Sequence, residues 1–261
     1  MPLLLLPFLW LLLPESARFL AAHNASASQI ANVLNKLGGT FTAATRFVMS
    51  EPQVQHKAPV RMLFTDQYRF GTLALWLTYF MGLLVIYLTM GWMPTLLRDG
   101  GLSIERAATI TGLFQIGGTV GAIVVGWAMD RHNPNAVIAT SYALGGAFIL
   151  LLGAFSLESS LLAVGVIAAG FCMSGAQTGL NAFAPGFYPT DCRATGVSWM
   201  LGIGRFGAIF GSLIGGAVLS LGLGLPLLFA MLSVPAFFAA LAILGNGRAR
   251  RRAISRAALA H

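Results

Sequence analysis

The chemistry that this sequence offers centres on Arg205, which lies about eleven residues into a long apolar stretch. A guanidinium stays protonated at neutral pH, and placing it inside a bilayer costs about 2.5 to 3.5 kcal/mol on insertion scales. None of the eight acidic residues falls in the middle of an apolar stretch, so we expect the counter-charge to arrive with a ligand. A planar guanidinium binds a carboxylate through two hydrogen bonds and also stacks on rings, which favours an aromatic carboxylate. The alternative is a structural arginine bonded to backbone carbonyls or to an acid in another half of the protein.

Amide and phenol side chains in neighbouring apolar stretches could complete such a site. Gln177 and Asn181 are four residues apart, so in a helix their amides share one face and could bond a phenolic hydroxyl or a carboxylate. Hydrogen bonds between helices would explain these amides equally well, and aromatic residues also anchor helix ends at the membrane interface. We predict that the following residues bind the substrate: Arg205, Gln177, Asn181, Gln115, Tyr87 and Tyr79.

The sequence lacks the residue patterns that are typical of enzymes and cofactor sites. Gly202, Gly204 and Gly207 spell the GxGxxG pattern of dinucleotide-binding folds, but no strand precedes them and no acidic residue follows Asp191. The sequence offers no nucleophile paired with a base, no cluster of metal ligands and no phosphate-binding loop. We therefore expect neither an enzyme nor a bound metal or cofactor.

The elements that position these residues are predicted from composition. Apolar residues make up 57% of the 261-residue chain and charged residues 9%, which fits a chain dissolved in a bilayer rather than in water. A helix needs about 20 apolar residues to cross about 30 Å of hydrocarbon. Six stretches meet this length: 71–97, 106–129, 136–155, 160–188, 194–221 and 225–244. The predicted fold class is an all-α membrane protein with a six-helix transmembrane bundle over residues 71–244.

The basic residues predict how the bundle lies in the membrane. Lys and Arg gather before residue 70, at Arg131 and Arg193, and in the tail 245–261, whereas the opposite side of the bundle holds only Arg98 and Arg106. The side with more positive charge is expected in the cytoplasm, so the leading segment and the basic tail are both predicted to be cytoplasmic. The net charge of +8 is explained by this topology and by attraction to anionic lipid, so we expect a lipid bilayer and no nucleic acid as partner.

The segment before the bundle has two parts. Residues 1–13 are apolar but short, and they fit either a signal peptide or the cytoplasmic end of a truncated transmembrane helix. We favour the helix end because no positively charged residue precedes the apolar run. Residues 14–70 have the composition of a cytoplasmic linker, in which apolar residues at helical spacing from Ile30 to Leu37, stopped by Gly38, predict a short amphipathic helix.

Three motifs resemble signatures of the major facilitator superfamily. Residues 14–20 (PESARFL) resemble the sequence that closes the sixth helix of these transporters before their central loop. Residues 126–131 (GWAMDR) resemble the GxxxDR motif between helices eight and nine, although residues 132–135 (HNPN) replace the usual glycine and basic pair. A third set is similar to the aromatic acid:proton symporter branch: residues 91–94 (GWMP), Gln115, Gly117, Gly118 and residues 204–208 (GRFGA).

This resemblance covers nearly the whole chain but matches only the second half of the fold. It implies the C-terminal half of an inner-membrane transporter that carries small aromatic acids such as 4-hydroxybenzoate together with protons. It also implies a gating role for Asp130 and Arg131, for which the alternative is a solvated pair of turn residues. The acidic motif of the family's first helix has no counterpart here and the four histidines fall outside the six stretches, so the proton carrier is expected in an N-terminal six-helix half.

A second hypothesis is that the chain is a non-transporting membrane subunit or a gene remnant. Such a subunit would pair with another six-helix half, or with a second copy of itself. The small residues Gly207, Gly211 and Gly215 recur every four positions and could form the contact surface.

Overall fold

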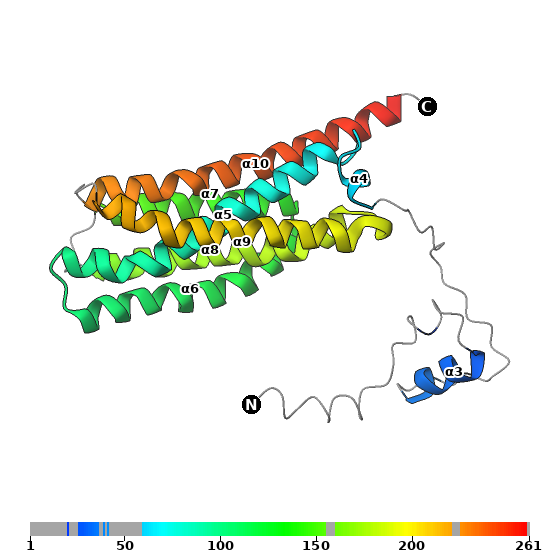
Figure 1. Cartoon of the computed structure of the whole chain (residues 1–261), viewed down its shortest axis with the longest axis horizontal. Coiled ribbons are helices and arrows are strands. Elements are labelled where there is room, and N and C mark those ends of the chain that lie inside the picture. Colours follow the sequence, from blue (N-terminus) through cyan, green and yellow to red (C-terminus); the bar gives the residue numbers. More distant parts are fainter. Residues whose placement is uncertain are drawn as a thin grey trace. The chain divides into compact units, whose positions relative to one another are not determined.

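The computed structural model describes residues 20, 26–36, 39, 41, 59–154, 160–220 and 225–259. The helices in this part (Figure 1) are α3 (Ala27–Lys36), α4 (Pro59–Leu63), α5 (Arg69–Asp99), α6 (Ile104–Arg131), α7 (Pro134–Leu152), α8 (Ser160–Phe187), α9 (Thr190–Ser220) and α10 (Leu225–Leu259). The six helices from α5 to α10 are long and apolar enough to cross a membrane. The predicted all-α fold with six spans is therefore confirmed, and residues 1–13 lie outside the described part.

The short connections between spans follow from local sequence. Gly101 joins α5 to α6 with a φ of 107°, a conformation that costs a glycine little. Ser103 then caps α6 through its side-chain oxygen. Asn133 caps α7 by accepting a hydrogen bond from the backbone N–H of Asn135, and Pro134 occupies the first helical turn, where its missing N–H loses no bond. The residues that interrupt the GxxxDR-like motif thus begin the next helix.

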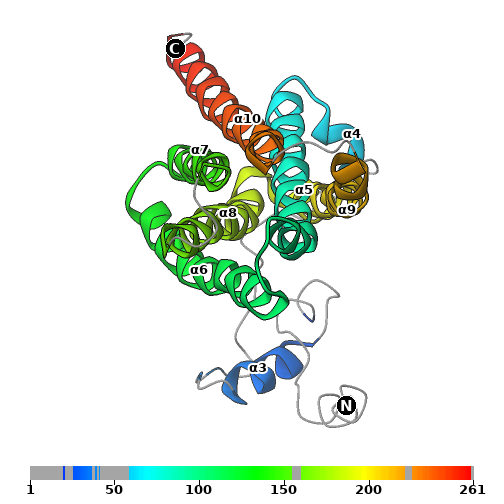
Figure 2. The same ribbon diagram turned by 90° about the vertical axis from the view of Figure 1, so that its left-hand side faces the viewer.

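The six long helices pack as three pairs, α6 with α8, α5 with α9 and α7 with α10, as Figure 2 shows when viewed close to the helix axes. Further contacts join α7 to α8 and α5 to α10. Successive helices run in opposite directions. We call the end of the bundle at which α5 begins the Arg69 end, and the opposite end the Asp99 end.

Glycines allow two of these pairs to approach very closely. On α9, a Cβ atom at Gly207 or at Gly211 would collide with the backbone of α5, at Phe80 and Leu84 respectively. On α6, a Cβ atom at Gly121 would collide with the backbone of α8. The glycine stripe of α9 is therefore covered within this chain, and the hypothesis that it contacts another subunit is wrong. Its role is to hold α9 on α5.

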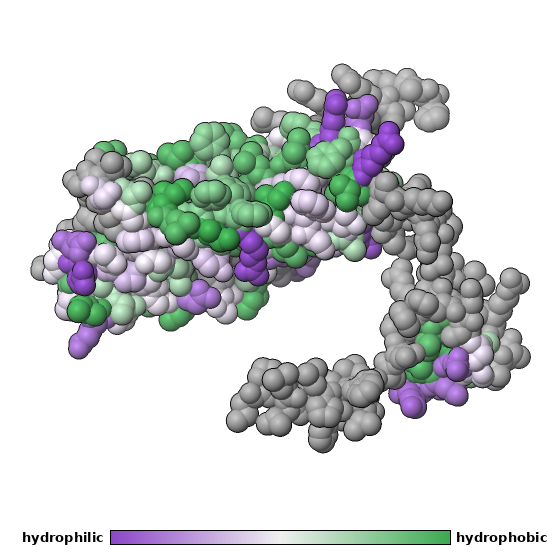
Figure 3. All heavy atoms as spheres, in the orientation of Figure 1, coloured by the Kyte–Doolittle hydropathy of each residue, from purple (hydrophilic) through white to green (hydrophobic). Residues whose placement is uncertain are grey.

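The remaining described elements fit the predicted outline. In the leading segment, where the sequence predicts an amphipathic helix, Ala27–Lys36 form α3, in which Ile30 and Ala31 are buried. It belongs to a separate compact unit, Met1–His56, whereas the six long helices belong to Lys57–His261. At the other end of the chain α10 continues to Leu259, so most of the basic tail extends the last helix. Figure 3 shows apolar residues over much of one face of the six-helix unit, and hydrophilic residues towards its ends and at a strongly hydrophilic spot near the middle.

Candidate functional site

Arg205 is the middle residue of the 31-residue helix α9, about 22 Å from either end at 1.5 Å per residue. Its side chain is exposed, and it makes no hydrogen bond or ion pair with any other described residue. The neighbouring Gly204 and Gly207 face α5, where Tyr79 and Phe80 fill the space that their side chains would occupy. Because these glycines turn one side of α9 inward, the guanidinium is turned to a side that none of the described helices covers.

The uncovered surface of α9 has two distinct stripes. Ser198, Gly202 and Arg205 lie on one side at helical spacing, and all three are exposed. Phe206 and Phe210 lie about 100° round the helix and are also exposed. We call the first set the polar stripe of α9 and the second its apolar stripe. The apolar stripe suits lipid, whereas a stripe that holds an arginine suits a water-filled or protein-covered cavity.

Helix α6 has the same arrangement around Gln115. Ala108, Gly112, Gln115 and Thr119 are exposed and form the polar stripe of α6. The apolar stripe of this helix is formed by the exposed residues Ile116, Val120 and Ile123. Gly117, two residues after Gln115, contacts the backbone of α8, as Gly207 contacts α5 two residues after Arg205.

The correspondence between the two helices extends along their length and was missed in the sequence. Residues 108–122 (ATITGLFQIGGTVGA) and 198–212 (SWMLGIGRFGAIFGS) share a pattern of a small residue, glycine, a long polar residue, glycine and glycine at identical spacing. Each position in the second helix follows its counterpart by 90 residues. A search for internal repeats would have found this signal and would have paired Gln115 with Arg205.

On α8 the structure separates two residues that were predicted to share one face. Asn181 is exposed, whereas Gln177 is only 6% exposed. The Tyr142 hydroxyl of α7 donates a hydrogen bond of 2.6 Å to Oε1 of Gln177. The Nε2 atom of Gln177 is buried without a hydrogen-bond partner in the described part of the chain. An unsatisfied buried donor costs about 1 to 3 kcal/mol, so this amide is an unusual feature of the core.

The two candidate tyrosines of α5 also differ. Tyr87 is 40% exposed, as a residue that touches a substrate should be. Tyr79 is only 6% exposed, and its ring packs against Gly204 of α9, next to Arg205. Tyr79 therefore supports the backbone beside Arg205 and, in this structure, does not line an open surface.

Helix contacts place the candidate residues at two depths. Arg205 lies beside Tyr79, and Gln177 beside Gly82, so both are near the same level of α5. Gln115 is eleven residues from the start of α6, and Tyr87 is twelve residues before the end of α5. Because a short turn joins the two helix ends, Gln115 and Tyr87 lie at a similar level. With 1.5 Å per residue, Tyr87 is about 12 Å along the bundle from Tyr79 and Arg205, more than the length of a single-ring acid, and about 7.5 Å from Gly82 and Gln177. Arg205, Gln177 and Asn181 thus form a middle level, and Tyr87 and Gln115 a second level nearer the Asp99 end.

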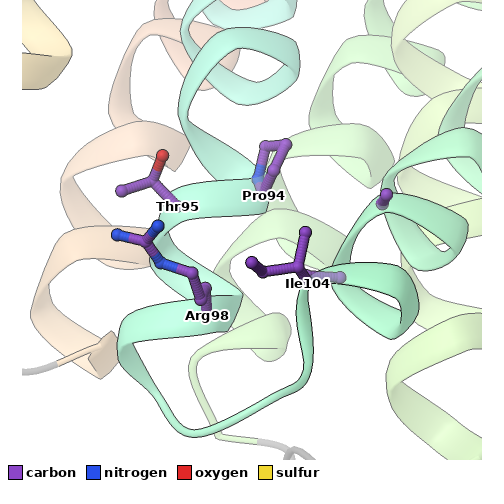
Figure 4. Close-up of a pocket in the computed structure, with 6 residues that line it drawn as sticks. Pro94, Thr95, Arg98 and Ile104 are labelled. Atoms are coloured by element: carbon purple, nitrogen blue, oxygen red, sulfur yellow. The ribbon is translucent and has the colours of Figure 1, made fainter.

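A small hollow lies beyond the second level, at the Asp99 end. It has a volume of about 160 Å³ and is lined by Pro94, Thr95, Arg98, Ile104, Ala107 and Ala108, four of which are labelled in Figure 4. Arg98 forms an ion pair with Asp99 at 3.5 Å. The hollow includes none of the predicted binding residues, although Ala108 begins the polar stripe of α6.

The predicted gating residues end α6 at the Arg69 end of the bundle. Arg131 lies over the ring of Trp127, with 4.1 Å from the guanidinium carbon to the ring centroid. Asp130 is exposed and forms no ion pair with another described residue. Their gating role stays a prediction.

Comparison with known proteins gives consistent results. The family model described as Major Facilitator Superfamily matches residues 75–259. The chain is 81% identical over 253 residues to a gallate transporter of Pseudomonas putida, covering 97% of this chain and 56% of that protein. It is 47% identical to the 4-hydroxybenzoate transporter PcaK of Pseudomonas aeruginosa, over 95% of this chain and 56% of the relative. It is 33% identical to a benzoate transport protein of Acinetobacter baylyi, over 90% of this chain and 51% of the relative. The chain thus spans about half the length of the curated relatives that it matches.

Proposed function

The chain belongs to the Major Facilitator Superfamily, as the C-terminal half of an aromatic acid transporter fold, and we propose that it supplies the anion-binding half of a carrier for small aromatic carboxylates. Hydroxybenzoates, including gallate and 4-hydroxybenzoate, are the proposed substrates because relatives named for their transport match almost the whole chain. The observation that carries the proposal is the exposed Arg205, which has no partner among the described residues and lies at the middle of a membrane span.

Arg205 is proposed to bind the substrate carboxylate. A guanidinium in a membrane needs an anion, and a carboxylate matches its planar donor geometry. Asn181 lies at the same level with an exposed amide, which can both donate to and accept from a ring hydroxyl. Tyr87 and Gln115, nearer the Asp99 end, are proposed to contact the substrate on its way to or from Arg205.

A second six-helix half is proposed to cover the polar stripes of α6 and α9. Two copies of this chain could form a similar cavity, but an N-terminal half accounts better for the length of the relatives. Proton coupling is proposed to depend on that half, because no Asp, Glu or His lies within the six spans of the described structure other than near their ends. The distribution of Lys and Arg supports an inner-membrane topology with the Arg69 end in the cytoplasm.

Uptake of radiolabelled 4-hydroxybenzoate and gallate tests the proposal. Cells without their own carrier would express this chain alone, this chain with a six-helix N-terminal half, or the pair with Arg205→Ala. Arg98→Ala is the matched control, because it removes the same charge from the surface near the hollow. We expect uptake by the pair and by the Arg98→Ala pair, and loss of uptake in the Arg205→Ala pair.

Two results would contradict the proposal. Equal uptake by the Arg205→Ala and Arg98→Ala pairs would refute the role of Arg205. No uptake in any arrangement, with all chains present in the membrane, would favour the alternative of a non-transporting subunit or gene remnant.

A further inference from the structure

The hollow at the Asp99 end lies between the last turns of α5 and the first turns of α6 (Figure 4). Its wall is mostly apolar, and the apolar residues that form it are Pro94 of α5 and Ile104, Ala107 and Ala108 of α6. Its volume is about 160 Å³. An apolar cavity of about 150 Å³ is large enough to hold a benzene ring, so the hollow has the size and the lining of a site for one aromatic ring.

The charge beside the hollow already has a partner. Arg98 forms its ion pair with Asp99 at 3.5 Å, and the two side chains are 57% and 51% exposed. A guanidinium that is both paired and in contact with water adds little attraction for a further anion. The hollow therefore offers a ligand apolar contact with a ring, and Arg98 takes no part in the site inferred below.

On α6 the hollow lies on the face that carries Gln115. Ala108 is four residues after Ile104 and seven before Gln115, so the three side chains share one side of the helix, and all three are exposed. Gly112 lies on the same side between Ala108 and Gln115, and nothing described lies within 4 Å of a Cβ atom placed there. This face of α6 is therefore open from the hollow to Gln115.

On α5 the hollow lies on the face that carries Tyr87. Gly91 and Pro94 follow Tyr87 at helical spacing, and Gly91 also has nothing described within 4 Å of a Cβ atom. Gly91 is eight residues before the end of α5, and Gly112 is eight residues after the start of α6, so both lie about 12 Å from the turn that joins the helices. The faces that carry Tyr87 and Gln115 thus both lead to the hollow.

We propose that the hollow is an outer binding site, in which the ring of an aromatic acid is held on its way between the Asp99 end and the level of Tyr87 and Gln115. This inference rests on the proposed function and deepens it, because it adds a third level at which the substrate is held. The apolar wall binds the ring, and the carboxylate stays in water at the open side of the hollow. The site therefore takes single-ring compounds with or without a carboxylate, unlike the site at Arg205.

Thiol labelling of Ala108→Cys tests the inference in the carrier assembled with a cysteine-free N-terminal half. Both native cysteines, Cys172 and Cys192, are buried, so a membrane-impermeant thiol reagent added to intact cells should react mainly with the new cysteine. Ala217→Cys is the matched control, because Ala217 is an exposed alanine near the end of α9, at the Asp99 end, and does not line the hollow. The labelling rate is measured without ligand and with 4-hydroxybenzoate, phenol or acetate.

We expect 4-hydroxybenzoate and phenol to slow the labelling of Ala108→Cys, by about tenfold at about ten times the dissociation constant, because only unoccupied sites react. Acetate has a carboxylate but no ring and should not slow it. No ligand should change the labelling of Ala217→Cys. The protection should persist in the Arg205→Ala background, because the hollow does not use that guanidinium.

Uptake tests whether the hollow lies on the route of the substrate. Ala108→Phe fills the hollow with a side chain, and we expect it to raise the KM for 4-hydroxybenzoate about three- to fivefold with little change in maximal rate, as for a lost binding contact. Ala217→Phe should leave KM unchanged. An unchanged KM in Ala108→Phe would overturn the placement of the hollow on the route.

The inference alone is overturned if the unmodified carrier takes up 4-hydroxybenzoate and neither this acid nor phenol slows the labelling of Ala108→Cys. Lipid or the other half would then fill the hollow. It is also overturned if the protection disappears with Arg205→Ala, because the effect would then come from the middle level. Protection by both ring compounds without any uptake by the unmodified carrier would support the ring site and contradict the proposed function.

Discussion

The α5–α9 and α6–α8 pairs are built alike but carry different chemistry. Gly207 of α9 and Gly117 of α6 each press against the backbone of the partner helix, and a long polar residue stands two positions earlier, Arg205 in one helix and Gln115 in the other. Both helices turn an apolar stripe outward beside the polar one. The main chemical difference lies in the side chain at this position, which is charged in α9 and neutral in α6.

This comparison separates the residues that hold the helices from those available for a ligand. Glycines set the distance between helices, and they recur because backbone contact leaves no room for a side chain. The polar residue points away from that contact, so it can change from Gln to Arg without a change in packing. The pairs also differ at one contact: Gly215 of α9 leaves room for Trp92 of α5, whereas its counterpart in α6 is Val125, which lies beside Gly175 of α8.

The largest effect is expected from filling the glycine contacts. Gly207→Val and Gly121→Val would each place a branched side chain against a backbone carbonyl of the partner helix. Overpacking of this kind costs about 1 to 3 kcal/mol or more, and the backbone cannot move aside as a side chain can. We expect most of the folded, monodisperse protein in detergent to be lost in both variants, as measured by size-exclusion chromatography.

Gly202→Val and Gly112→Val are the matched controls, because nothing lies within 4 Å of a Cβ atom at either position. These variants should give yields close to that of the unmodified chain. If Gly207→Val also gave a normal yield, α9 would not depend on close contact with α5, and the proposed likeness of the two pairs would fail.

The next effect tests the difference between the pairs. Arg205→Gln gives α9 the residue that α6 has, and in the assembled carrier it should weaken 4-hydroxybenzoate binding by about 2 to 5 kcal/mol, at least about thirtyfold. Adding Gln115→Arg should not restore uptake, because the two positions differ in depth by about 12 Å. Competition binding would measure the affinity of both variants for 4-hydroxybenzoate, and uptake assays would measure their transport of it. Recovery in the exchanged variant would show that either helix can hold the charge.

Sequence patterns predicted the scaffold better than the site. Apolar length predicted all six spans, because the bilayer requires that length. The sequence did not show that Gln177 and Tyr79 turn inward while Asn181 stays exposed. Their orientation depends on which helices are neighbours. The role of Gly82, which leaves room for Gln177 and Tyr142, can be seen only once these helices are placed side by side. A buried tyrosine hydroxyl usually needs a partner, but composition cannot name it.

A smaller effect is expected at Gln115, the neutral residue of α6 that corresponds to Arg205 of α9. Gln115→Leu removes one hydrogen-bonding group at the second level and leaves Arg205 intact, so we expect a loss of about 0.5 to 1.5 kcal/mol, or about two- to twelvefold in KM. Ile116→Leu, on the adjacent apolar stripe, should leave KM unchanged. A loss as large as that of Arg205→Gln would mean that the neutral residue contributes as much to binding as the charged one.

The smallest effect concerns the contact that only one pair has. The Nε1 atom of Trp92 on α5 donates a hydrogen bond of 2.9 Å to the backbone carbonyl of Ser212 on α9. Trp92→Phe removes this bond, and hydrogen bonds between membrane helices contribute about 0.6 kcal/mol on average. A lowering of the melting temperature by about 1 to 2 °C should follow, with uptake unchanged. Trp127→Phe, which keeps a ring beneath Arg131, should not lower it. If Trp92→Phe instead abolished uptake at normal stability, the indole would act at the site itself, and the α5–α9 pair would differ from α6–α8 in more than the charge of one residue.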